Sequence, residues 1–423
     1  MTVSSQAPQP PQASRWRQLA RQARDGLPDV AAFCGALLCA GLAAVLTGLL
    51  GGCGGGVGSE GTGTGAVGSF SSGTITGFGS IVVNGVHFDE TSALLQDNDG
   101  QAVARSSLAL GMVVQITGGP QATAADGTAT AVASAVRTKR ALVGPAAAVV
   151  ANASANTGSL SVLGQTVLVS ADTVLDARLS GGLAGISSGQ LLEVYGYYDS
   201  TRAVYSASRI APADMGTGYR VSGPVAAVDL QARIFTLGSQ TYSLAGLSGS
   251  PASGDQVRLK LQAGTDSGGR WLVSSTRPDD AAPRDSAGAE IDGVVSAVLA
   301  GSRFVVNGVT VDTSAAKLSG PVLVGSKVEV SGKLSAGVLL ASTVEADSGR
   351  AKTFELSGTL SSLDTANRRF VVRGTTVGYA RADLVFSGGT AARLVAYGGK
   401  LKVEGLPSAD RTVLDAIRIK FDD

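Results

Sequence analysis

Beyond residue 71 the chain alternates apolar and polar positions with a period of two, and no stretch follows the period of a helix. Such alternation predicts β-strands that bury one face. Three short patterns recur there in a constant order. The first, glycine-x-apolar-x-x-apolar, starts at five glycines that lie 65 to 79 residues apart: Gly73, Gly144, Gly223, Gly293 and Gly358. A constant order of patterns at this spacing predicts a tandem array of one small β module.

The second pattern predicts a hairpin in each copy. It consists of two apolar positions around a third residue, a two-residue turn and a further apolar position. In the copies at 81–88 and 304–311 the turn is Asn-Gly. Asn-Gly between alternating strand formers is a strong hairpin signal, because both turn residues take positive φ. The other copies keep the spacing with different turn residues, at 160–167, 235–242 and 370–377.

The third pattern, glycine-x-x-apolar-x-apolar-x-glycine, predicts a bent strand. It occurs at 111–118, 189–196, 325–332 and 398–405. The third module departs from it, with Leu261 in place of the last glycine. The apolar pair points inward and the residues between point outward, and these outward residues are polar or charged except Tyr195. Glycines at the ends of the strand suit the sharp bends of a small barrel.

Each copy closes with another short strand, so a module has about five strands. An open sheet of that size would leave exposed edges, which favours closure into a barrel. The sequence therefore predicts an all-β protein of five tandem five-stranded barrels, OB-like in topology, each with an apolar core of its own. The expected bounds of modules 1 to 5 are 72–140, 141–217, 218–288, 289–352 and 353–423.

The run from Gly73 to Asp89, together with 111–118, resembles a bacterial repeat called domain of unknown function 5666. The resemblance is good in modules 1 and 4, fair in module 5 and limited to spacing in modules 2 and 3. The family occurs in exported proteins and lipoproteins, mainly of proteobacteria. The resemblance implies an envelope protein, and it brings no assigned activity and no catalytic residues.

The N-terminal part has the layout of an export signal. Four arginines between Arg15 and Arg24 precede an uncharged apolar run at 30–50. The run ends in Leu50-Gly51-Gly52-Cys53, which resembles the lipobox of bacterial lipoproteins. The resemblance implies that residues 1–52 are a signal peptide and that Cys53 is acylated. An uncleaved anchor stays the alternative, because 21 apolar residues can span a bilayer.

Two features follow from the residues after the cysteine. Residues 53–71 are rich in Gly, Ser and Thr and are expected to form a flexible tether. The residue after Cys53 is Gly54 and not aspartate, which by resemblance to lipoprotein sorting implies the outer membrane. The expected partner is therefore the membrane, bound through an N-terminal lipid.

The composition argues against several classes of function. The chain has 34 Lys and Arg against 33 Asp and Glu, so it lacks the positive charge of a general nucleic-acid binder. A single histidine cannot build a multi-histidine metal site, and no phosphate-binding glycine loop is visible, so neither metal nor cofactor is expected.

Five residues or short motifs remain as candidates for chemistry. Tyr195 and Tyr197 alternate on an outward face, where they either contact a neighbouring module or bind a sugar or peptide. His87 occupies an outward position that holds threonine in the other modules. The motif 97–100, Asp-Asn-Asp-Gly, is expected to be a turn and not a truncated calcium loop. Trp271 is expected in a core or interface.

These observations favour a non-enzymatic scaffold or binding role at the cell envelope, since no catalytic constellation is found. Repetition of one module also multiplies weak sites, which raises avidity. A glycan or peptide binder that uses the Tyr195 and Tyr197 face is one alternative. A hydrolase with a site between modules is the other, and a cleft with converging acidic and basic residues would favour it.

Overall fold

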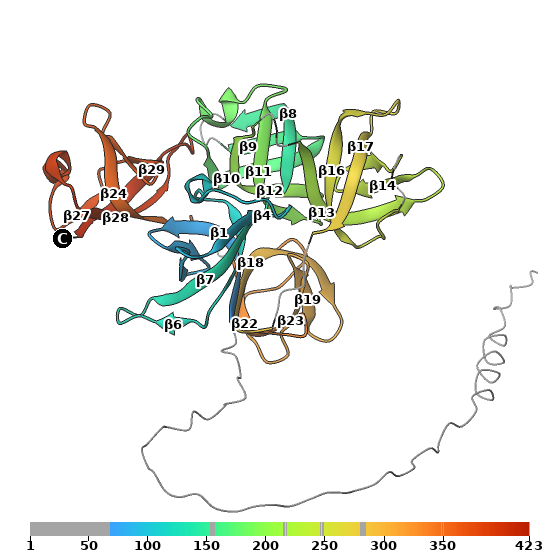
Figure 1. Ribbon diagram of the computed structural model, residues 1–423, viewed down its shortest axis with the longest axis horizontal. Helices are drawn as coiled ribbons and strands as arrows, with labels where there is room; N and C mark the ends of the chain where they lie inside the picture. Colours follow the sequence, from blue (N-terminus) through green and yellow to red (C-terminus); the bar gives the residue numbers. More distant parts are fainter. Residues whose placement is uncertain are drawn as a thin grey trace, which may run out of the picture. The chain divides into compact units, whose positions relative to one another are not determined.

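The computed structural model describes residues 68–422, apart from 153–156, 215, 217, 246, 248, 280–284, 348 and 350. In this part of the chain the regular structure is β-strand, with three short 3₁₀ helices at η1 (Arg105–Ser107), η2 (Gly182–Gly185) and η3 (Ala391–Ala396). The all-β prediction is confirmed. The strands form five successive rings, each a closed cycle of five paired strands (Figure 1).

Ring 1 follows directly on the first described residue. It consists of β1 (Ser69–Phe78), β2 (Ile81–Val83), β3 (Val86–Asp89), β5 (Val113–Gly118) and β7 (Ala129–Thr138), with β4 (Leu94–Asp97) and β6 (Ala122–Thr123) beside β7. β1 pairs with β2, β2 with β3, β3 with β7, β7 with β5, and β5 again with β1. Only the pairing of β3 with β7 in this cycle is parallel. This is a five-stranded Greek-key barrel of the OB type.

Rings 2 and 3 have the same order of pairing. Ring 2 consists of β8 (Leu142–Asn152), β9 (Thr157–Val162), β10 (Gln165–Leu175), β11 (Leu191–Asp199) and β12 (Val204–Pro212). Ring 3 consists of β13 (Tyr219–Asp229), β14 (Ile234–Leu237), β15 (Gln240–Ser243), β16 (Gln256–Thr265) and β17 (Trp271–Pro278).

Rings 4 and 5 repeat it once more, each with an additional short strand. Ring 4 consists of β18 (Ser286–Leu299), β19 (Arg303–Val306), β20 (Val309–Asp312), β22 (Lys327–Ser335) and β23 (Val338–Ala346), with β21 (Lys317–Ser319) beside β23. Ring 5 consists of β24 (Phe354–Asp364), β25 (Arg369–Val372), β26 (Thr375–Gly378), β28 (Lys400–Pro407) and β29 (Leu414–Asp422), with β27 (Val385–Ser387) beside β29.

The hairpin and bend predicted from the sequence are both present. Asn84 and Gly85 have φ of 52° and 74°, and Asn307 and Gly308 repeat this with 50° and 79°. The fourth strand of every ring shifts register against the fifth, at the position of the last glycine in the third pattern. At Gly196 a Cβ would lie 2.2 Å from the carbonyl oxygen of Ser206, so a side chain would disturb this bulge.

Neighbouring rings share main-chain hydrogen bonds, which the sequence did not predict. β8 of ring 2 pairs with β13 of ring 3 through Val143 and Arg220. β1 pairs in parallel with β18 of ring 4 through 69–72 and 288–291, and its last residues pair with β24 of ring 5. The strands therefore continue from ring to ring in two sheets, of 19 and 10 strands.

The apolar cores follow these joins. One core combines rings 1 and 5, a second combines rings 2 and 3, and a third lies in ring 4 together with Phe70. The expectation that each module hides a core of its own is therefore wrong for rings 1, 2, 3 and 5, whereas ring 4 has a core of its own to which Phe70 is added. Strand pairing across ring boundaries brings apolar side chains of two rings into contact, and their burial extends the core from one ring into the next.

Candidate functional site

The motif 97–100 forms a tight turn directly after β4, as expected. The carboxylate of Asp97 accepts hydrogen bonds from the main-chain N–H groups of Asp99 and Gln101, both at 2.9 Å. Gly100 closes the turn with φ of 82° and donates to the carbonyl oxygen of Asp97. Because Asp97 holds the turn itself, the side chain of Asp99 is free to leave the turn and reach ring 3.

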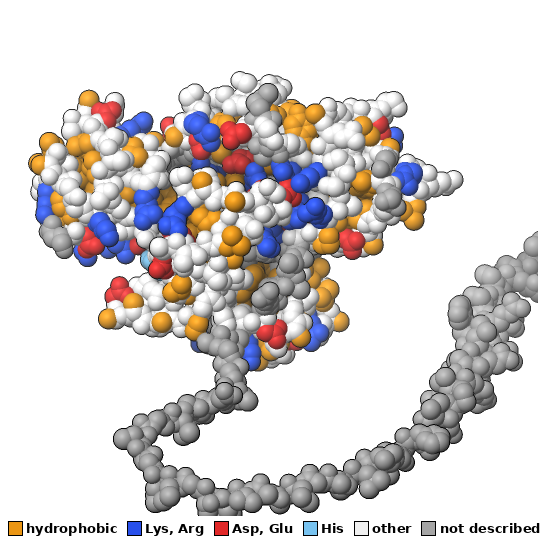
Figure 2. All heavy atoms as spheres, viewed as in Figure 1, with side chains coloured by type: hydrophobic (Ala, Val, Ile, Leu, Met, Phe, Trp, Pro, Cys, Tyr) orange, Lys and Arg blue, Asp and Glu red, His pale blue; other side chains and the backbone are white. Residues whose placement is uncertain are grey.

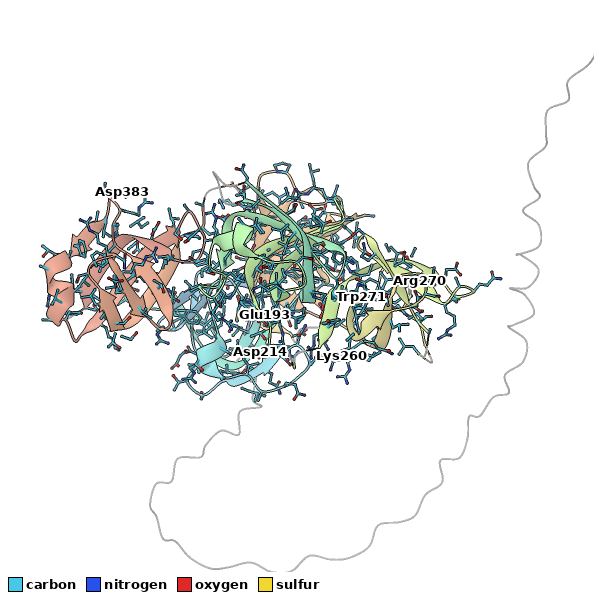
Figure 3. All side chains as sticks on the ribbon, turned by 90° about the horizontal axis from the view of Figure 1, so that it is seen from above. Glu193, Asp214, Lys260, Arg270, Trp271 and Asp383 are labelled. Atoms are coloured by element: carbon cyan, nitrogen blue, oxygen red, sulfur yellow. The ribbon has the colours of Figure 1, made fainter. Side chains whose placement is uncertain are left out.

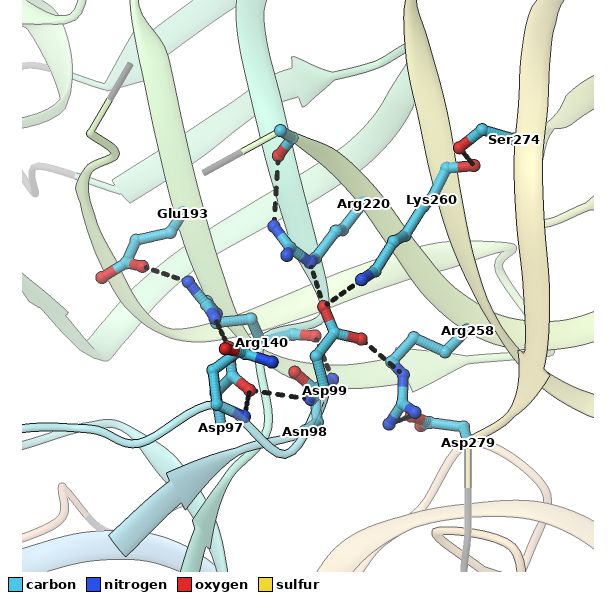
Figure 4. Close-up of polar contacts among 12 residues, drawn as sticks. Asp97, Asn98, Asp99, Arg140, Glu193, Arg220, Arg258, Lys260, Ser274 and Asp279 are labelled. Atoms are coloured by element: carbon cyan, nitrogen blue, oxygen red, sulfur yellow. Dashed lines mark hydrogen bonds and ion pairs between the residues drawn. The ribbon is translucent and has the colours of Figure 1, made fainter. Parts of the chain in front are cut away.

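Asp99 lies in a basic pocket on ring 3, with 2% of its side chain exposed. Its carboxylate accepts a hydrogen bond from Nε of Arg220 at 2.8 Å and forms ion pairs with Lys260 at 3.2 Å and Arg258 at 3.4 Å (Figure 4). Burial raises the pKa of Asp99, but the hydrogen bond and charge of Arg220, and then those of Lys260, hold it below its ordinary value. Rings 1 and 3 are therefore joined by a buried ionic contact.

Arg140 extends this network toward ring 2. It lies between rings 1 and 2, and its guanidinium donates to the carboxylate of Asp97 and forms an ion pair with Glu193 at 3.7 Å (Figure 4). Figure 2 shows basic and acidic side chains side by side on this face of the molecule, over β4, β11 and β13. Charges of both signs from three rings therefore meet at one place.

A cavity of about 740 Å³ begins beside Arg140. It is enclosed by the segment 102–112 of ring 1, by the ends of β10, β11 and β12 in ring 2, and by the turn 373–376 of ring 5. Glu193 and Asp214 line it and lie in the same region of Figure 3. Its volume falls within the roughly 300–1,000 Å³ of small-molecule sites.

Glu193 and Tyr195 enter the cavity wall from one strand. They are two residues apart on β11, so their side chains share one face of it. Burial is the main cause that raises the pKa of Glu193, and the charge of Arg140 opposes it. Among the described residues neither the Glu193 carboxylate nor the Tyr195 hydroxyl has a hydrogen-bond partner, although Tyr195 is only 3% exposed.

Asp176 and two arginines form the opposite part of the wall. Arg209 is buried, donates to the carbonyl oxygen of Leu110 at 3.1 Å and donates to Asp176 at 2.5 Å. Arg178 donates to the other oxygen of Asp176 at 2.8 Å. Burial raises the pKa of Asp176, but the hydrogen bond from Arg178 and the charge of Arg209 hold it below its ordinary value. Asp176 is therefore a carboxylate held in position by two arginines.

The two predicted tyrosines have different surroundings. Tyr195 lines the cavity, whereas Tyr197 is buried against ring 1 and shares a hydrogen bond of 3.1 Å with the hydroxyl of Thr74. Both belong to the core that combines rings 1 and 5. Of the two alternatives, contact with a neighbouring module describes Tyr197, because ring 1 packs over this side of β11 and covers it, so the two tyrosines do not form one exposed face.

The other candidates have structural surroundings. His87 is half-buried on β3, and its Nδ1 lies 3.1 Å from the hydroxyl of Ser80. Trp271 is half-buried, lies edge-on to Tyr219 with ring centroids 5.5 Å apart, and packs against the core of rings 2 and 3. Cys53, the predicted lipidation site, lies outside the described residues.

In the part of the chain that the structure describes, no group of three or more His, Cys, Asp or Glu is arranged to hold a metal ion. No helix in the described ranges has the length and hydropathy needed to cross a membrane. The apolar run 30–50 lies outside these ranges.

Arg140, Asp176 and Arg209 could not be recognised from the sequence as members of one site. Arg140 lies between β7 and β8, Asp176 directly follows β10, and Arg209 lies on β12, so they line one cavity only in the folded chain. The one usable signal was Tyr195, an aromatic residue at a position that is polar or charged in the other modules.

Comparisons with known proteins identify two parts of the chain. The model of the domain of unknown function 5666 family matches residues 148–211, in ring 2, and 292–345, in ring 4. The good resemblance expected for module 4 is confirmed. The expectation that module 2 resembles the family only in spacing is wrong, since the second module carries one of the two matches.

The remaining comparisons are distant. No curated protein matches the chain. A solved structure described as "drosophila Unr CSD456" is 11% identical, and the match covers 50% of this chain and 99% of that chain with a TM-score of 0.13. What the comparisons establish is that this chain contains the domain of unknown function 5666 twice, at 148–211 and 292–345.

Proposed function

We propose that the protein is an exported, lipid-anchored scaffold of the cell envelope, built from five copies of one β-barrel module. The identical pairing order of the five rings supports the five copies, as does the bulge at the same place in each. The family matches in rings 2 and 4 support them as well. On this proposal rings 1, 3 and 5 are diverged members of the same repeat.

The contacts between rings support the scaffold role. Main-chain hydrogen bonds link ring 2 to ring 3 and ring 1 to rings 4 and 5. A buried carboxylate, Asp99, links ring 1 to ring 3 in addition. Such joins hold modules in fixed places, whereas modules on flexible linkers would move independently. A fixed array suits a protein that positions partners.

The cavity supports binding more than catalysis. Its charged residues converge, which would suit a hydrolase, but most are held in ion pairs: Asp176 by two arginines and Asp97 by Arg140. Glycoside hydrolysis needs two carboxyl groups with separate roles on the two sides of the bond. Of the four described carboxylates that line the cavity, Glu193 is the one for which no hydrogen bond is found, although it forms an ion pair with Arg140. A glycan-binding role through Tyr195 therefore remains as the second proposal, without Tyr197.

Anchoring and location rest on the sequence. The arginines before the apolar run, the small residues before Cys53 and the Gly54 after it support a lipid anchor in the outer membrane. The protein is expressed with an alkyne fatty acid, and the label is read on the purified chain. Wild type and the control Cys34→Ala are expected to carry label, and Cys53→Ala none. Labelled Cys53→Ala, or a wild type that fractionates with the inner membrane, would overturn the respective part of the proposal.

The scaffold role is tested by cross-linking in intact cells. Wild-type protein is expected to yield envelope proteins that co-purify with it, and the Cys53→Ala variant is expected to lose them because it leaves the membrane surface. Recovery of the same partners with Cys53→Ala would show that the anchor does not position the array. Recovery of none from wild type would contradict the scaffold role.

A further inference from the structure

The geometry points to a ligand for the cavity between rings 1, 2 and 5: a small, hydroxyl-rich carboxylate of the uronic acid type. This inference rests on the second proposal, a glycan-binding role through Tyr195, for which it names the class of ligand, and it does not depend on the lipid anchor. Its grounds are the charges of the cavity, two groups in its wall that lack hydrogen-bond partners, and its mixed polar and apolar surface.

The charge of the cavity favours an anion. Five arginines and four carboxylates line it, and no lysine does. Asp97 and Asp176 are neutralised by arginines. Arg373, on the ring 5 side, donates only to carbonyl oxygens, those of Ser357 and Gly79. Arg220 is bound to Asp99, so Arg373 is the lining arginine without a carboxylate partner among the described residues. Guanidinium groups bind carboxylates in a planar, two-pronged geometry.

Two groups in the wall that lack a hydrogen-bond partner point to a polar ligand. Tyr195 is 3% exposed and lines the cavity, and its hydroxyl has no hydrogen-bond partner among the described residues. A hydroxyl that lines a cavity without a protein partner is available to a water or a ligand. Glu193, two residues earlier, presents a carboxyl group without a hydrogen bond on the same face of β11. Together they offer two hydrogen-bonding groups to a ligand.

The rest of the wall suits a sugar ring. Hydroxyl groups of Ser107, Thr375 and Thr376 line one part of the cavity, and Leu110 and Met112 line another. A saccharide presents hydroxyls around its edge and C–H groups on its faces, so it needs both kinds of surface. A free inorganic anion would use the arginines alone and leave the apolar part unused.

Glu193 makes the binding depend on pH. Arg140, Arg209 and Arg178 face its carboxyl group and favour ionisation, while burial and the charge of Asp176 oppose it. An ionised Glu193 repels a ligand carboxylate, whereas a protonated one donates a hydrogen bond to it. Affinity is therefore expected to increase as the pH falls from 8 toward the raised pKa of Glu193, while a uronic acid with a carboxyl pKa of roughly 3–4 stays ionised.

The test is calorimetric titration of the purified full chain with D-glucuronate, with D-glucose and inorganic phosphate as comparison ligands. Glucuronate is expected to bind on the order of tenfold more tightly than glucose, because a charge-assisted bidentate contact is lost with the neutral sugar. It is also expected to bind more tightly than phosphate. Equal affinity for glucose and glucuronate, tighter binding of phosphate, or no heat with any of the three would overturn the inference.

Three variants locate the site. Tyr195→Phe removes only a hydroxyl and is expected to weaken glucuronate binding on the order of 3- to 10-fold. The matched control is Tyr198→Phe, on the same strand but packed against Tyr205 with ring centroids 5.0 Å apart, and it is expected to bind like wild type. Glu193→Gln is expected to bind more tightly at pH 8 and to lose the pH dependence. Equal effects of the two tyrosine variants, or an unchanged pH profile in Glu193→Gln, would place the ligand elsewhere.

The same measurements on Cys53→Ala separate this inference from the scaffold proposal. Binding that is intact in a mislocalised protein supports the cavity even if the anchor proposal fails. A correctly anchored protein that does not bind glucuronate refutes the cavity ligand alone.

Discussion

At the scale of single residues, the first two sequence patterns meet in one contact between a glycine and an asparagine. A Cβ at Gly73 would lie 2.2 Å from Oδ1 of Asn84, and one at Gly293 would lie 2.4 Å from Oδ1 of Asn307. The asparagine side chain thus lies directly against the glycine, and Nδ2 of Asn84 donates to the carbonyl oxygen of Ser72. The sequence predicted the hairpin from Asn-Gly alone. It could not predict this contact, because the two patterns meet only when the first strand pairs with the second.

Gly73→Ala tests this contact. The added methyl group must displace Asn84, and overpacking of this kind costs about 1–3 kcal/mol. Gly264→Ala is the control, since its Cβ would meet nothing within 4 Å and it also lies in a strand. Urea unfolding is expected to show a lower midpoint for Gly73→Ala only. Equal midpoints for the two variants would show that Asn84 moves aside without cost.

Glu290 is a second residue whose role depends on the packing of rings. It lies on β18, accepts a hydrogen bond from Nε2 of Gln121 in ring 1 at 3.1 Å, and keeps its other carboxylate oxygen buried without a partner. Burial is the main cause that raises its pKa to about 7, and the charge of Glu329 adds to it. A raised acid pKa means that ionisation destabilises the folded state.

The pH dependence follows from this sign. The destabilising effect of Glu290 is fully present above pH 7 and declines as the pH falls from about 7 toward the unfolded value near 4.5. Glu290→Gln is expected to raise the melting temperature at pH 8 and to have little effect at pH 5. Thermal unfolding at both values measures it. A variant that is less stable than wild type at pH 8 would contradict the assigned cost.

At the scale of elements, the turn after β4 acts as a connector between rings. Asp99 reaches Arg220 on β13 and both Arg258 and Lys260 on β16. The sequence predicted the turn, because Asp and Gly favour it, and gave no sign of its partners more than 100 residues away. The bends in the fourth strand of each ring were easier to predict from the sequence than these partners. A glycine marks the bulge in four rings, and in ring 3 the register shifts at Leu261 without one.

Asp99→Asn removes the charge and keeps the shape. Three cations then share a pocket without their carboxylate, and breaking a buried ionic contact costs on the order of 3 kcal/mol. The exposed pair of Arg381 with Asp383 supplies the control, because Asp383→Asn is expected to leave stability unchanged. Denaturant unfolding at pH 7 compares the two.

The same residue predicts an acid response. The pKa of Asp99 is lowered on folding, so its contribution is present above about pH 4 and is lost as the pH falls through the lower folded value. The difference in stability between wild type and Asp99→Asn is expected to shrink below pH 4. A constant difference down to pH 2 would show that charge is not the cause.

At the scale of the whole chain, the β-rich repeat was predictable and the merging of its units was not. Period-two alternation, Asn-Gly turns and spaced glycines specify a local barrel, since each acts within one ring. Shared cores depend on which outward faces meet, and polar outward residues give no such signal. Tyr195 did, and it lies in the core of rings 1 and 5.

The shared core of rings 2 and 3 predicts that they unfold together. β8 and β13 are hydrogen-bonded, and one apolar cluster extends through both rings. Hydrogen exchange measured by mass spectrometry is expected to give these two strands one common opening free energy. Exchange of β13 at denaturant concentrations where β8 stays protected would show that the rings open separately.

The position of β1 has a mechanical consequence. It begins at Ser69, and along its length it is bonded to β5 in its own ring, to β18 in ring 4 and to β24 in ring 5. Tension on the chain before Ser69 is applied along the axis of this strand, so several hydrogen bonds resist it simultaneously in shear. Force applied there acts on three rings at once. β1 must slide against its partner strands before any of these rings can unfold from that end.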